Sequence, residues 1–310
     1  MIIRDNILIS VSDLDFEFGK IRIPEGVTTI GPRAFYYCLS LEKVVFPKSL
    51  DTICDEAFTG CDGLTKITLP DTIKRLGKGV FNDCVWLKSI ILPRTLTQIE
   101  DKMFNSCTSL ETITISESVK WIGNGAFEGC TSLKFVNIEN GVTEIRRGAF
   151  RGCTSLEAIT IPNTVKTICS YVFEGCTSLK YIHMANGIKH IKEGAFRGCT
   201  SLESINIPGS IERLPMYLFD KCTSLKDVVL NHGLSIIHTA AFNDCTSIKN
   251  IIIPNSVKYI DLYVTDDKPS GQRVRLNNII TYGKIIEINE YILDHGGVFY
   301  FRYYRRDNYI

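Results

Sequence analysis

Cysteine is the residue type with the most chemical potential in this sequence, because thiolates bind metals and oxidise to disulfides. The chain has 310 residues and contains 12 cysteines. Most of them recur at an interval of 23 residues, beginning with Cys38 and Cys61 (61 − 38 = 23). The members of this row are Cys38, Cys61, Cys84, Cys107, Cys130, Cys153, Cys176, Cys199, Cys222 and Cys245. A phenylalanine lies three residues before each of them, as Phe35 lies before Cys38.

Two kinds of chemistry are open to such a row, and each has its own geometry. A disulfide needs Cβ atoms about 3.8 Å apart on converging vectors, and zinc needs four ligands at the corners of a tetrahedron. Equivalent residues on stacked strands have parallel vectors about 4.8 Å apart, which suits neither. The row therefore predicts buried free thiols, no metal site and no cofactor, and it favours a reducing compartment. Cys54 and Cys169 lie outside the row and are interpreted as incidental small residues.

The apolar residues around the cysteines repeat with the same period, and they indicate the elements that position the thiols. In one unit these residues are Leu156, Ile159, Ile161, Val165 and Ile168. Ile159 and Ile161 are two residues apart and so share one face of a predicted strand, which Pro162 ends because it has no N–H to donate. Val165 and Ile168 predict a second, shorter segment on the opposite wall. A fixed period of this length is typical of a solenoid, whose coils bury their apolar side chains against one another.

The full repeat pattern, A-F-x-x-C-x-x-L-x-x-I-x-I-P-x-x-V-x-x-I, resembles the BspA-like leucine-rich repeat of 23 residues. The resemblance extends from about residue 20 to residue 261, which is most of the chain. It implies a β-rich solenoid, a right-handed superhelix with a parallel sheet on one face and short strands or turns on the other. It also implies a role in protein recognition, often adhesion at a cell surface, and many relatives are secreted.

The repeat boundaries predict three regions. Residues 1–19 are expected to cap the N-terminal end, residues 20–261 to form ten to eleven repeat units, and residues 262–310 to cap the C-terminal end. Within the last region Val274 and Leu276 fit the two strand positions of a degenerate coil. Solenoids need atypical end units because the last coil would otherwise expose its core.

The C-terminal region also suggests strands at residues 285–288 and 298–306, the second of which is rich in arginine and tyrosine. Basic and aromatic residues together are typical of single-strand nucleic-acid binding. The region as a whole is close to neutral, however, and a neutral module is a poor binder of phosphates. The prediction is therefore a cap and no nucleic-acid partner.

The sharpest candidate for a binding surface lies in the middle of the predicted sheet, in the outward positions of the strands. Its members are Phe135, Asn137, Tyr181, His183 and Asn206. Exposed aromatic side chains with small polar neighbours are typical of protein interface hot spots. The partner is predicted to be another protein, with a carbohydrate or matrix ligand as the alternative. Strands also favour aromatic residues without any binding role, and that interpretation stays open.

The opposite wall offers one further candidate, Trp121, as a partner contact or a partly covered surface residue. The sheet side also carries a column of charges directly after the repeat leucine. From Lys88 to Lys226 the sign alternates at every coil: Lys88, Glu111, Lys134, Glu157, Lys180, Glu203 and Lys226. Because opposite charges on adjacent strands attract, the column is interpreted as a register device, with a ligand site as the alternative.

Catalysis is not predicted. The five histidines lack ligand spacings such as H-E-x-x-H, and the sequence has no phosphate-binding loop, dinucleotide glycine pattern or G-x-S-x-G motif. The net charge of +1 provides no long-range field for nucleic acid or an anionic membrane. No apolar run approaches the roughly 20 residues needed to span a bilayer. The predicted function is thus non-catalytic protein recognition, with a structural or self-assembling solenoid element as the alternative.

The N-terminal sequence lacks the basic start and uninterrupted apolar stretch of a signal peptide, since Arg4, Asp5 and Asn6 break its only apolar run. The expectation is a cytoplasmic protein, with the cell surface or secretion as the alternative implied by the family. A monomer is expected.

Overall fold

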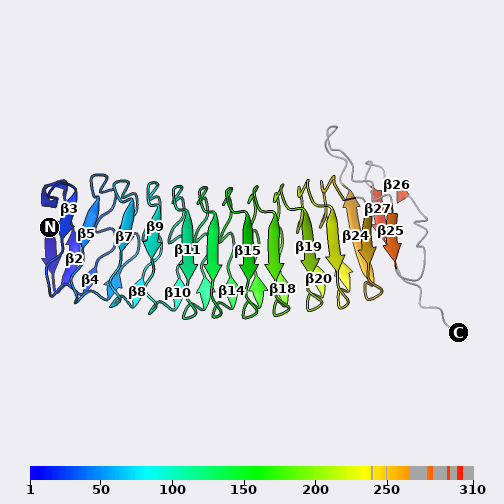
Figure 1. Cartoon of the computed structure of the whole chain (residues 1–310), viewed down its shortest axis with the longest axis horizontal. Coiled ribbons are helices and arrows are strands. Elements are labelled where there is room, and N and C mark those ends of the chain that lie inside the picture. Colours follow the sequence, from blue (N-terminus) through cyan, green and yellow to red (C-terminus); the bar gives the residue numbers. More distant parts are fainter. Residues whose placement is uncertain (239, 249, 265–277, 282–291, 294–298, 303–310) are drawn as a thin grey trace.

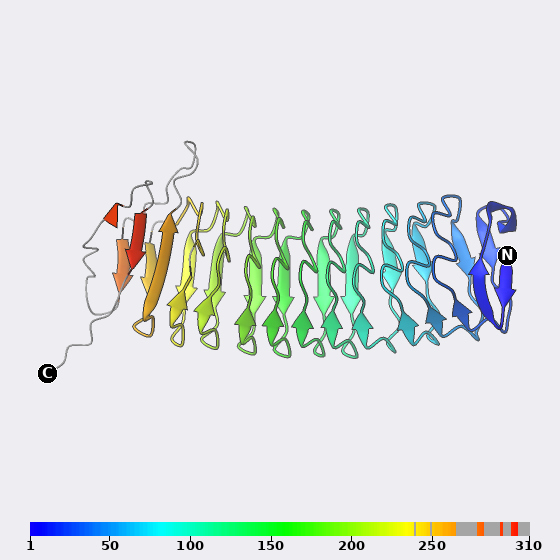
Figure 2. The same ribbon diagram turned by 180° about the vertical axis from the view of Figure 1, so that it is seen from behind.

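The computed structural model describes residues 1–238, 240–248, 250–264, 278–281, 292–293 and 299–302. Within them the chain winds into a long β-solenoid whose coils follow one another from one end of the molecule to the other (Figures 1 and 2). The only helical element described is one turn of 3-10 helix, η1 (Asp13–Asp15). None of the described residues belongs to a helix with the length and apolar composition that crossing a membrane requires.

One wall of the solenoid, here called the long-strand face, is formed by the L-x-x-I-x-I segments. Its strands are β3 (Lys20–Arg22), β5 (Lys43–Val45), β7 (Lys66–Thr68), β9 (Ser89–Ile91), β11 (Thr112–Ile115), β13 (Phe135–Ile138), β15 (Ala158–Ile161), β17 (Tyr181–Met184), β19 (Ser204–Ile207), β21 (Asp227–Leu230), β23 (Asn250–Ile253) and β25 (Asn278–Thr281). They are hydrogen bonded in parallel pairs, such as β11 with β13 and β15 with β17.

The other wall, here called the short-strand face, is formed by the x-x-V-x-x-I segments. Its strands are β2 (Ile7–Ser10), β4 (Thr29–Ile30), β6 (Thr52–Ile53), β8 (Arg75–Leu76), β10 (Gln98–Ile99), β12 (Trp121–Ile122), β14 (Glu144–Ile145), β16 (Thr167–Ile168), β18 (His190–Ile191), β20 (Arg213–Leu214), β22 (Ile236–Ile237) and β24 (Tyr259–Val264). Here five consecutive strands, from β10 to β18, form one parallel sheet. The predicted architecture, with a parallel sheet on one wall and short strands on the other, is confirmed.

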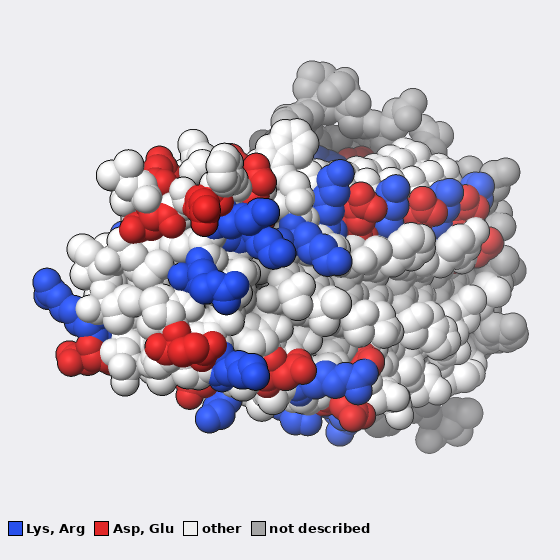
Figure 3. All heavy atoms as spheres, turned by 60° about the vertical axis from the view of Figure 1, so that its left-hand side comes forward, with Lys and Arg blue, Asp and Glu red and all other residues white. Residues whose placement is uncertain are grey.

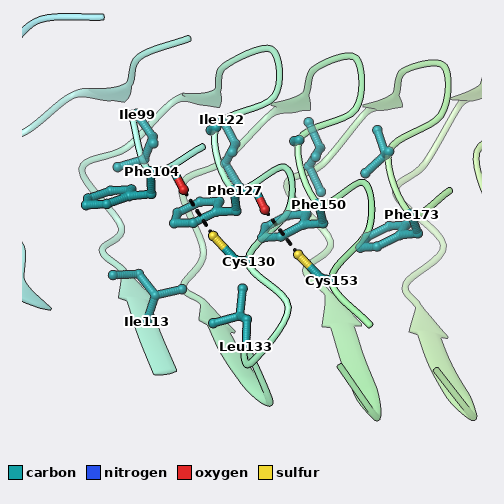
Figure 4. Close-up of a cluster of buried hydrophobic side chains, with 14 of the residues drawn as sticks. Ile99, Phe104, Ile113, Ile122, Phe127, Cys130, Leu133, Phe150, Cys153 and Phe173 are labelled. Carbon is teal, nitrogen blue, oxygen red and sulfur yellow. Dashed lines mark hydrogen bonds between the residues drawn. The ribbon is translucent and has the colours of Figure 1, made fainter. Parts of the chain in front are cut away.

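The strand register shows that residues 23 positions apart lie beside one another. Thr112 pairs with Phe135 across β11 and β13, and Glu144 pairs with Thr167 across β14 and β16. Phe127 and Phe150 stack with their ring centroids 5.2 Å apart and their planes 3° from parallel. A stack of this kind continues without interruption from Phe35 to Phe242. The rings fill the centre of the solenoid between the two walls (Figure 4).

The corner that carries each phenylalanine is a tight turn with two residues in the left-handed backbone region. In the coils of Gly152 and Gly175 the second of these positions has φ of +70° and +72°. The same position in a later coil is held by Lys221, with φ of +63°. A side chain other than glycine costs roughly 1–2 kcal/mol in this conformation.

Lys221→Gly is therefore expected to raise the free energy of unfolding by about 0.5–1 kcal/mol, after the entropic cost of glycine in the unfolded chain. Gly152→Ala is the matched control, because an added Cβ there would meet only backbone atoms 3.8 Å away. It should destabilise by about 1 kcal/mol from the backbone conformation alone. Urea denaturation of both variants measures the difference, and a change of the same sign in both would refute the explanation.

The two ends of the chain depart from the repeat. Near the N-terminus β1 (Ile2–Arg4) pairs antiparallel with β2, which in turn pairs parallel with β4. Near the C-terminus β27 (Phe299–Arg302) pairs antiparallel with both β24 and β26 (Ile292–Leu293). The strand predicted within residues 298–306 is thus confirmed for its described part. The segment 285–288, also predicted as a strand, lies outside the described residues.

Two residues predicted to occupy strand positions fall in a part of the chain that the structure does not describe. Val274 and Leu276 lie outside the described residues, and the strand that pairs with β23 is β25, with Asn250 opposite Asn278. That coil spans 28 residues instead of 23 (278 − 250 = 28). The additional length between the two strands moves the strand position along the chain, which the fixed period could not anticipate.

Candidate binding surfaces

Phe135 and Tyr181 project from the long-strand face, where 66% and 59% of their surfaces are exposed. They point outward because they precede an inward-facing residue in β13 and β17, and side chains alternate along a strand. Ala158, opposite Tyr181 in the register, occupies the coil between them. With strands about 4.8 Å apart, the two rings flank the small Ala158 side chain at a separation of roughly 10 Å.

The polar members of the predicted patch lie two residues further along the strands. Asn137, His183 and Asn206 are all exposed. Asn206 is held in place, since its Oδ1 accepts a hydrogen bond of 2.7 Å from Nδ2 of Asn231. The structure therefore brings the five predicted residues of this face onto one continuous surface.

The surface around these residues is almost free of charge. Six consecutive coils contribute two outward residues each, and none of these twelve residues is an aspartate, glutamate, lysine or arginine. These residues are Ser89, Ile91, Thr112, Thr114, Phe135, Asn137, Ala158, Thr160, Tyr181, His183, Ser204 and Asn206. In Figure 3 a broad uncharged area adjoins a row of alternating basic and acidic side chains. A neutral surface with two protruding rings can make apolar contacts and neutral hydrogen bonds.

Trp121 lies elsewhere, at the start of β12 on the short-strand face. It is half-buried, and the guanidinium carbon of Arg146 lies 4.5 Å from its ring centroid. Nε of Arg146 is also 3.1 Å from a carboxylate oxygen of Glu144. The six predicted residues thus occupy two different faces of the solenoid, five on one and Trp121 on the other.

The alternating column from Lys88 to Lys226 does not form close ion pairs within the described part of the chain, since no charged atoms of the column lie within 4.0 Å of each other. Its members are exposed, so water and salt screen their attraction. Adjacent coils are joined there by backbone hydrogen bonds, such as Lys134 N–H to the carbonyl of Glu111 at 2.9 Å. Backbone hydrogen bonds, more than the alternating charges that the sequence suggested, therefore hold the adjacent coils in register.

A ladder of close ion pairs does exist, but at a different position, directly after the ladder phenylalanines. Nε of Arg151 lies 2.9 Å from Glu174, and Nη1 of Arg151 lies 3.6 Å from Glu128. Arg197 continues the ladder, at 3.3 Å from Glu174 and 2.8 Å from Asp220. Asp220 is only 2% exposed. Sequence reasoning missed this ladder, although the alternation from Glu128 to Asp220 at 23-residue spacing could have revealed it.

Arg197→Met is expected to destabilise the chain by about 2–3 kcal/mol, because it leaves the buried Asp220 carboxylate without its cation. Adding Asp220→Asn should recover most of the loss. Arg33→Met is the control, since Arg33 and its partner Glu56 are both well exposed and such pairs contribute at most about 1 kcal/mol. Thermal or urea unfolding measures all three, and equal effects of Arg197→Met and Arg33→Met would contradict the argument.

The ten thiols of the repeated row are buried, as predicted. In the nine from Cys61 onward, Sγ donates a hydrogen bond to the carbonyl oxygen of the phenylalanine one coil earlier, as Cys130 does to Phe104 at 3.1 Å and Cys153 to Phe127 at 3.2 Å (Figure 4). Burial raises the pKa of the Cys153 thiol well above its usual range. These are the properties of structural thiols, since the reactive form of cysteine is the thiolate.

The two cysteines outside the row differ from each other. Cys54 is half-buried. Cys169 is buried, and its Sγ donates to Oε1 of Glu144 at 3.6 Å, so the interpretation of Cys169 as incidental misses a specific contact. Within the described residues, no three cysteine, histidine, aspartate or glutamate side chains are grouped so that they could hold a metal ion.

A small pocket opens at the turn corner between Lys102, Glu128, Arg147 and Tyr171. Its volume is about 140 Å³, well below the roughly 300–1,000 Å³ of most small-molecule sites. The guanidinium carbon of Arg147 lies 5.1 Å from the Tyr171 ring centroid. The pocket is thus too small for most small-molecule ligands.

The chain matches the family model for the BspA type leucine-rich repeat region over residues 28–157 and 143–269. No individually curated protein sequence matches it. Among solved structures it is similar to a leucine-rich cell surface protein from Faecalibacterium prausnitzii, with 27% identity and a TM-score of 0.45 over 77% of this chain and 83% of that one. It is also similar to the leucine-rich repeat protein of T. pallidum, with 30% identity and a TM-score of 0.49 over 59% of this chain and 78% of that one.

The matched residues contain nearly all of the repeat units, and the structure folds them into the stacked coils that the repeat pattern predicts. This chain belongs to the family of BspA-type leucine-rich repeat proteins.

Proposed function

We propose that this chain is a non-catalytic recognition protein that binds another protein through its long-strand face. The observation that carries the proposal is the exposure of Phe135 and Tyr181 on either side of Ala158, in an almost uncharged surface. Membership of a family of leucine-rich repeat proteins supports a role in interaction rather than catalysis.

The physical argument is that aromatic rings bring a large apolar area at a small entropic cost. Each ring has only two side-chain torsions to fix, and the strands that carry Phe135 and Tyr181 are already held by their hydrogen-bonded partners β11 and β15. Burial of such a ring in a partner's pocket commonly contributes 2 kcal/mol or more. The hydroxyl and amide groups nearby can satisfy polar groups of the partner at the rim.

The test is a double variant, Phe135→Ala with Tyr181→Ala, compared with the intact chain in an affinity capture quantified by mass spectrometry. Trp86→Ala is the matched control, because Trp86 is 58% exposed but lies outside the strands of this face. Partners retained by the intact chain and the control, but lost from the double variant, would support the proposal. Partners that bind all three alike would reject it, and a neutral glycan array in parallel separates protein from carbohydrate ligands.

A second candidate, self-assembly, is favoured by the N-terminal end of the solenoid. Leu14 and Phe18 are 96% and 89% exposed there, and β1 is the edge strand of its sheet. Edge strands with exposed apolar neighbours are sites at which another chain can add a strand. Light scattering of the intact chain and of Leu14→Ser with Phe18→Ser tests this candidate. A concentration-independent monomer, which the sequence predicts, would remove it.

The compartment stays a prediction, namely the cytoplasm, with the cell surface as the alternative. The thiol row does not discriminate between them, because thiols this deeply buried are shielded from oxidants and would stay reduced in either compartment. Cell fractionation combined with protease accessibility of the intact cells is the direct test.

A further inference from the structure

The short-strand face carries a cluster of lysines whose charges the described structure does not neutralise, and it lies away from the face discussed above. We propose that this cluster, consisting of Lys120, Lys166, Lys189 and Lys192 and here called the lysine patch, binds a short acidic segment of a partner protein. The proposal concerns a second surface and does not depend on the function proposed for the long-strand face.

The backbone places the four lysines side by side. Thr143 N–H donates to the carbonyl of Lys120 at 2.8 Å, Lys166 N–H to Thr143 at 2.8 Å, and Lys189 N–H to Lys166 at 2.9 Å. Lys120, Lys166 and Lys189 thus form one row across four coils, with Thr143 between the first two. Lys192 follows Lys189 by three residues and lies on the other side of β18. It belongs to a second row, in which Arg146, Cys169 and Lys192 lie on consecutive coils.

The charges in the patch are of one sign. All four lysines are exposed, and within the described part of the chain none of them forms an ion pair. Two carboxylates lie close to the lysines in the described structure, and both have other partners: Glu144 lies 3.1 Å from Arg146, and Glu193 accepts a hydrogen bond of 2.6 Å from the Tyr171 hydroxyl. In a chain with a net charge of +1, such a cluster is a local exception. Lysines brought together without ion-pair partners of their own repel one another, and an anionic ligand would relieve that repulsion.

The extent of the patch limits the length of its ligand. Glutamates flank the patch at both ends. Glu100 lies in the row of Lys192, in the coil that precedes the coil of Lys120. Glu212 lies in the row of Lys189, in the coil that follows the coil of Lys189. The positive surface therefore ends after four coils, or roughly 15 Å. A fully extended peptide spans about 3.3 Å per residue, so about five residues fit. A longer polyanion along the solenoid would run onto the carboxylates at both ends.

The residue types favour an acidic peptide segment over other anions. Lysines are depleted in the apolar centres of interfaces between folded proteins. Trp121, which follows Lys120 at the start of β12, is a large apolar residue beside the patch, and it is half-buried. Nucleic-acid strands stack their bases on free aromatic faces, whereas the Trp121 ring has the guanidinium of Arg146 over it. Lysine ammonium groups on flexible stems adapt to carboxylates along a peptide without requiring one fixed geometry.

Trp121 provides a direct readout of binding at the patch. The chain contains two tryptophans, so Trp86→Phe leaves Trp121 as the only one. The probe is a synthetic peptide with five consecutive glutamates, and its control has glutamine at the same positions. In this background the acidic peptide is expected to change Trp121 fluorescence in a saturable and salt-sensitive manner, whereas the glutamine peptide is not.

Two triple variants locate the site. Lys166→Ala with Lys189→Ala and Lys192→Ala is expected to weaken peptide binding by roughly tenfold or more. The matched control removes three exposed lysines of the long-strand side, Lys43→Ala with Lys66→Ala and Lys88→Ala, and should leave binding unchanged. An equal loss in both triple variants would show nonspecific attraction and overturn the proposal.

The class of ligand is tested by competition with a sulfated oligosaccharide and a single-stranded oligonucleotide. Tighter binding of either one than of the acidic peptide would overturn the assignment to a protein segment, as would absence of peptide binding at low salt. Because Phe135 and Tyr181 lie on the other wall, their double variant should bind the acidic peptide normally. Failure of this proposal and failure of the long-strand-face proposal are therefore distinguishable.

Discussion

Phe150→Ala is expected to lower the free energy of unfolding by about 3–5 kcal/mol, the usual cost of truncating a buried phenylalanine. Phe150 is fully buried, and its ring stacks at 5.2 Å on Phe127 and at 5.6 Å on Phe173. The truncation therefore leaves a cavity in the middle of the ring stack and removes contacts with both neighbouring coils. Because each coil is stabilised chiefly by its neighbours, the loss weakens the solenoid at its centre.

Urea denaturation followed by circular dichroism measures this effect. Phe18→Ala is the matched control, because Phe18 is 89% exposed and its truncation removes little packing. It should change stability by no more than about 0.5 kcal/mol. A loss below about 1 kcal/mol for Phe150→Ala would show that the ring stack fills space without holding the coils together.

Alkaline pH is expected to destabilise this chain unusually steeply, and the buried thiols are the cause. Burial raises the pKa of Cys84, Cys176 and Cys245 to about 12, and the backbone hydrogen bond beside each sulfur only partly offsets this effect. In the unfolded chain the same thiols have a pKa of about 8.5. As the pH rises above that value, the unfolded state releases protons that the folded state keeps.

The sign follows from proton linkage. The unfolded state binds fewer protons above pH 8.5, so the free energy of unfolding falls as the pH rises. The contribution of each thiol is fully present below about pH 8.5 and is lost progressively up to about pH 12. Well above pH 8.5 the loss approaches roughly 1.4 kcal/mol per pH unit for each thiol, or about 4 kcal/mol per unit for these three together.

The measurement is the free energy of unfolding between pH 8 and pH 10.5, under reducing conditions. Cys176→Ala should reduce the slope against pH in the upper part of that range by up to about 1.4 kcal/mol per unit, because one linked proton is gone. Subtracting its curve from that of the intact chain cancels the contributions of lysine and tyrosine. An unchanged slope, or rapid reaction of the native thiols with a thiol reagent at pH 8, would contradict the assignment.

The repeat pattern was sufficient to predict where the core lies. Ile159 and Ile161 are buried in β15, and Ile168 is buried in β16, as their spacing and Pro162 indicate. The prediction succeeds because a two-residue alternation and a proline act locally, whereas stacking repeats that local result in every coil. The strand at Asn278–Thr281 was not predicted, because it lies 28 residues after its partner and the 23-residue period carries no information on a coil of irregular length.

The sequence predicted that the candidate binding residues face outward, but it did not predict their side-chain contacts. Exposure of Phe135 and Tyr181 follows from strand alternation. The placement of Arg146 over Trp121 could not be predicted in this way. It depends on which side-chain rotamers remain sterically allowed beside the neighbouring coil. The role of the candidate binding residues in contacting a partner stays a prediction.

For the charged residues as well, the sequence predicted one part of the arrangement and the structure decided the other. The sequence displays the alternation of the exposed lysine and glutamate column, but only the side-chain geometry shows that its charges do not meet at short range. The close ion pairs form instead beside the phenylalanine corner, where Asp220 is buried and Arg197 lies 2.8 Å from it. Sequence spacing fixes which residues are neighbours, whereas distance and burial decide how strongly they interact.

By itself, the amino-acid sequence determined the coil length, the two walls, the buried phenylalanine and cysteine rows and the residues that face outward. These features are periodic, and a 23-residue period places equivalent residues in register once the coils stack. The tertiary structure alone decided which charges pair and which thiols find acceptors. Those properties depend on side-chain conformations and on the path of each turn in three dimensions, and these vary between coils that share one sequence pattern.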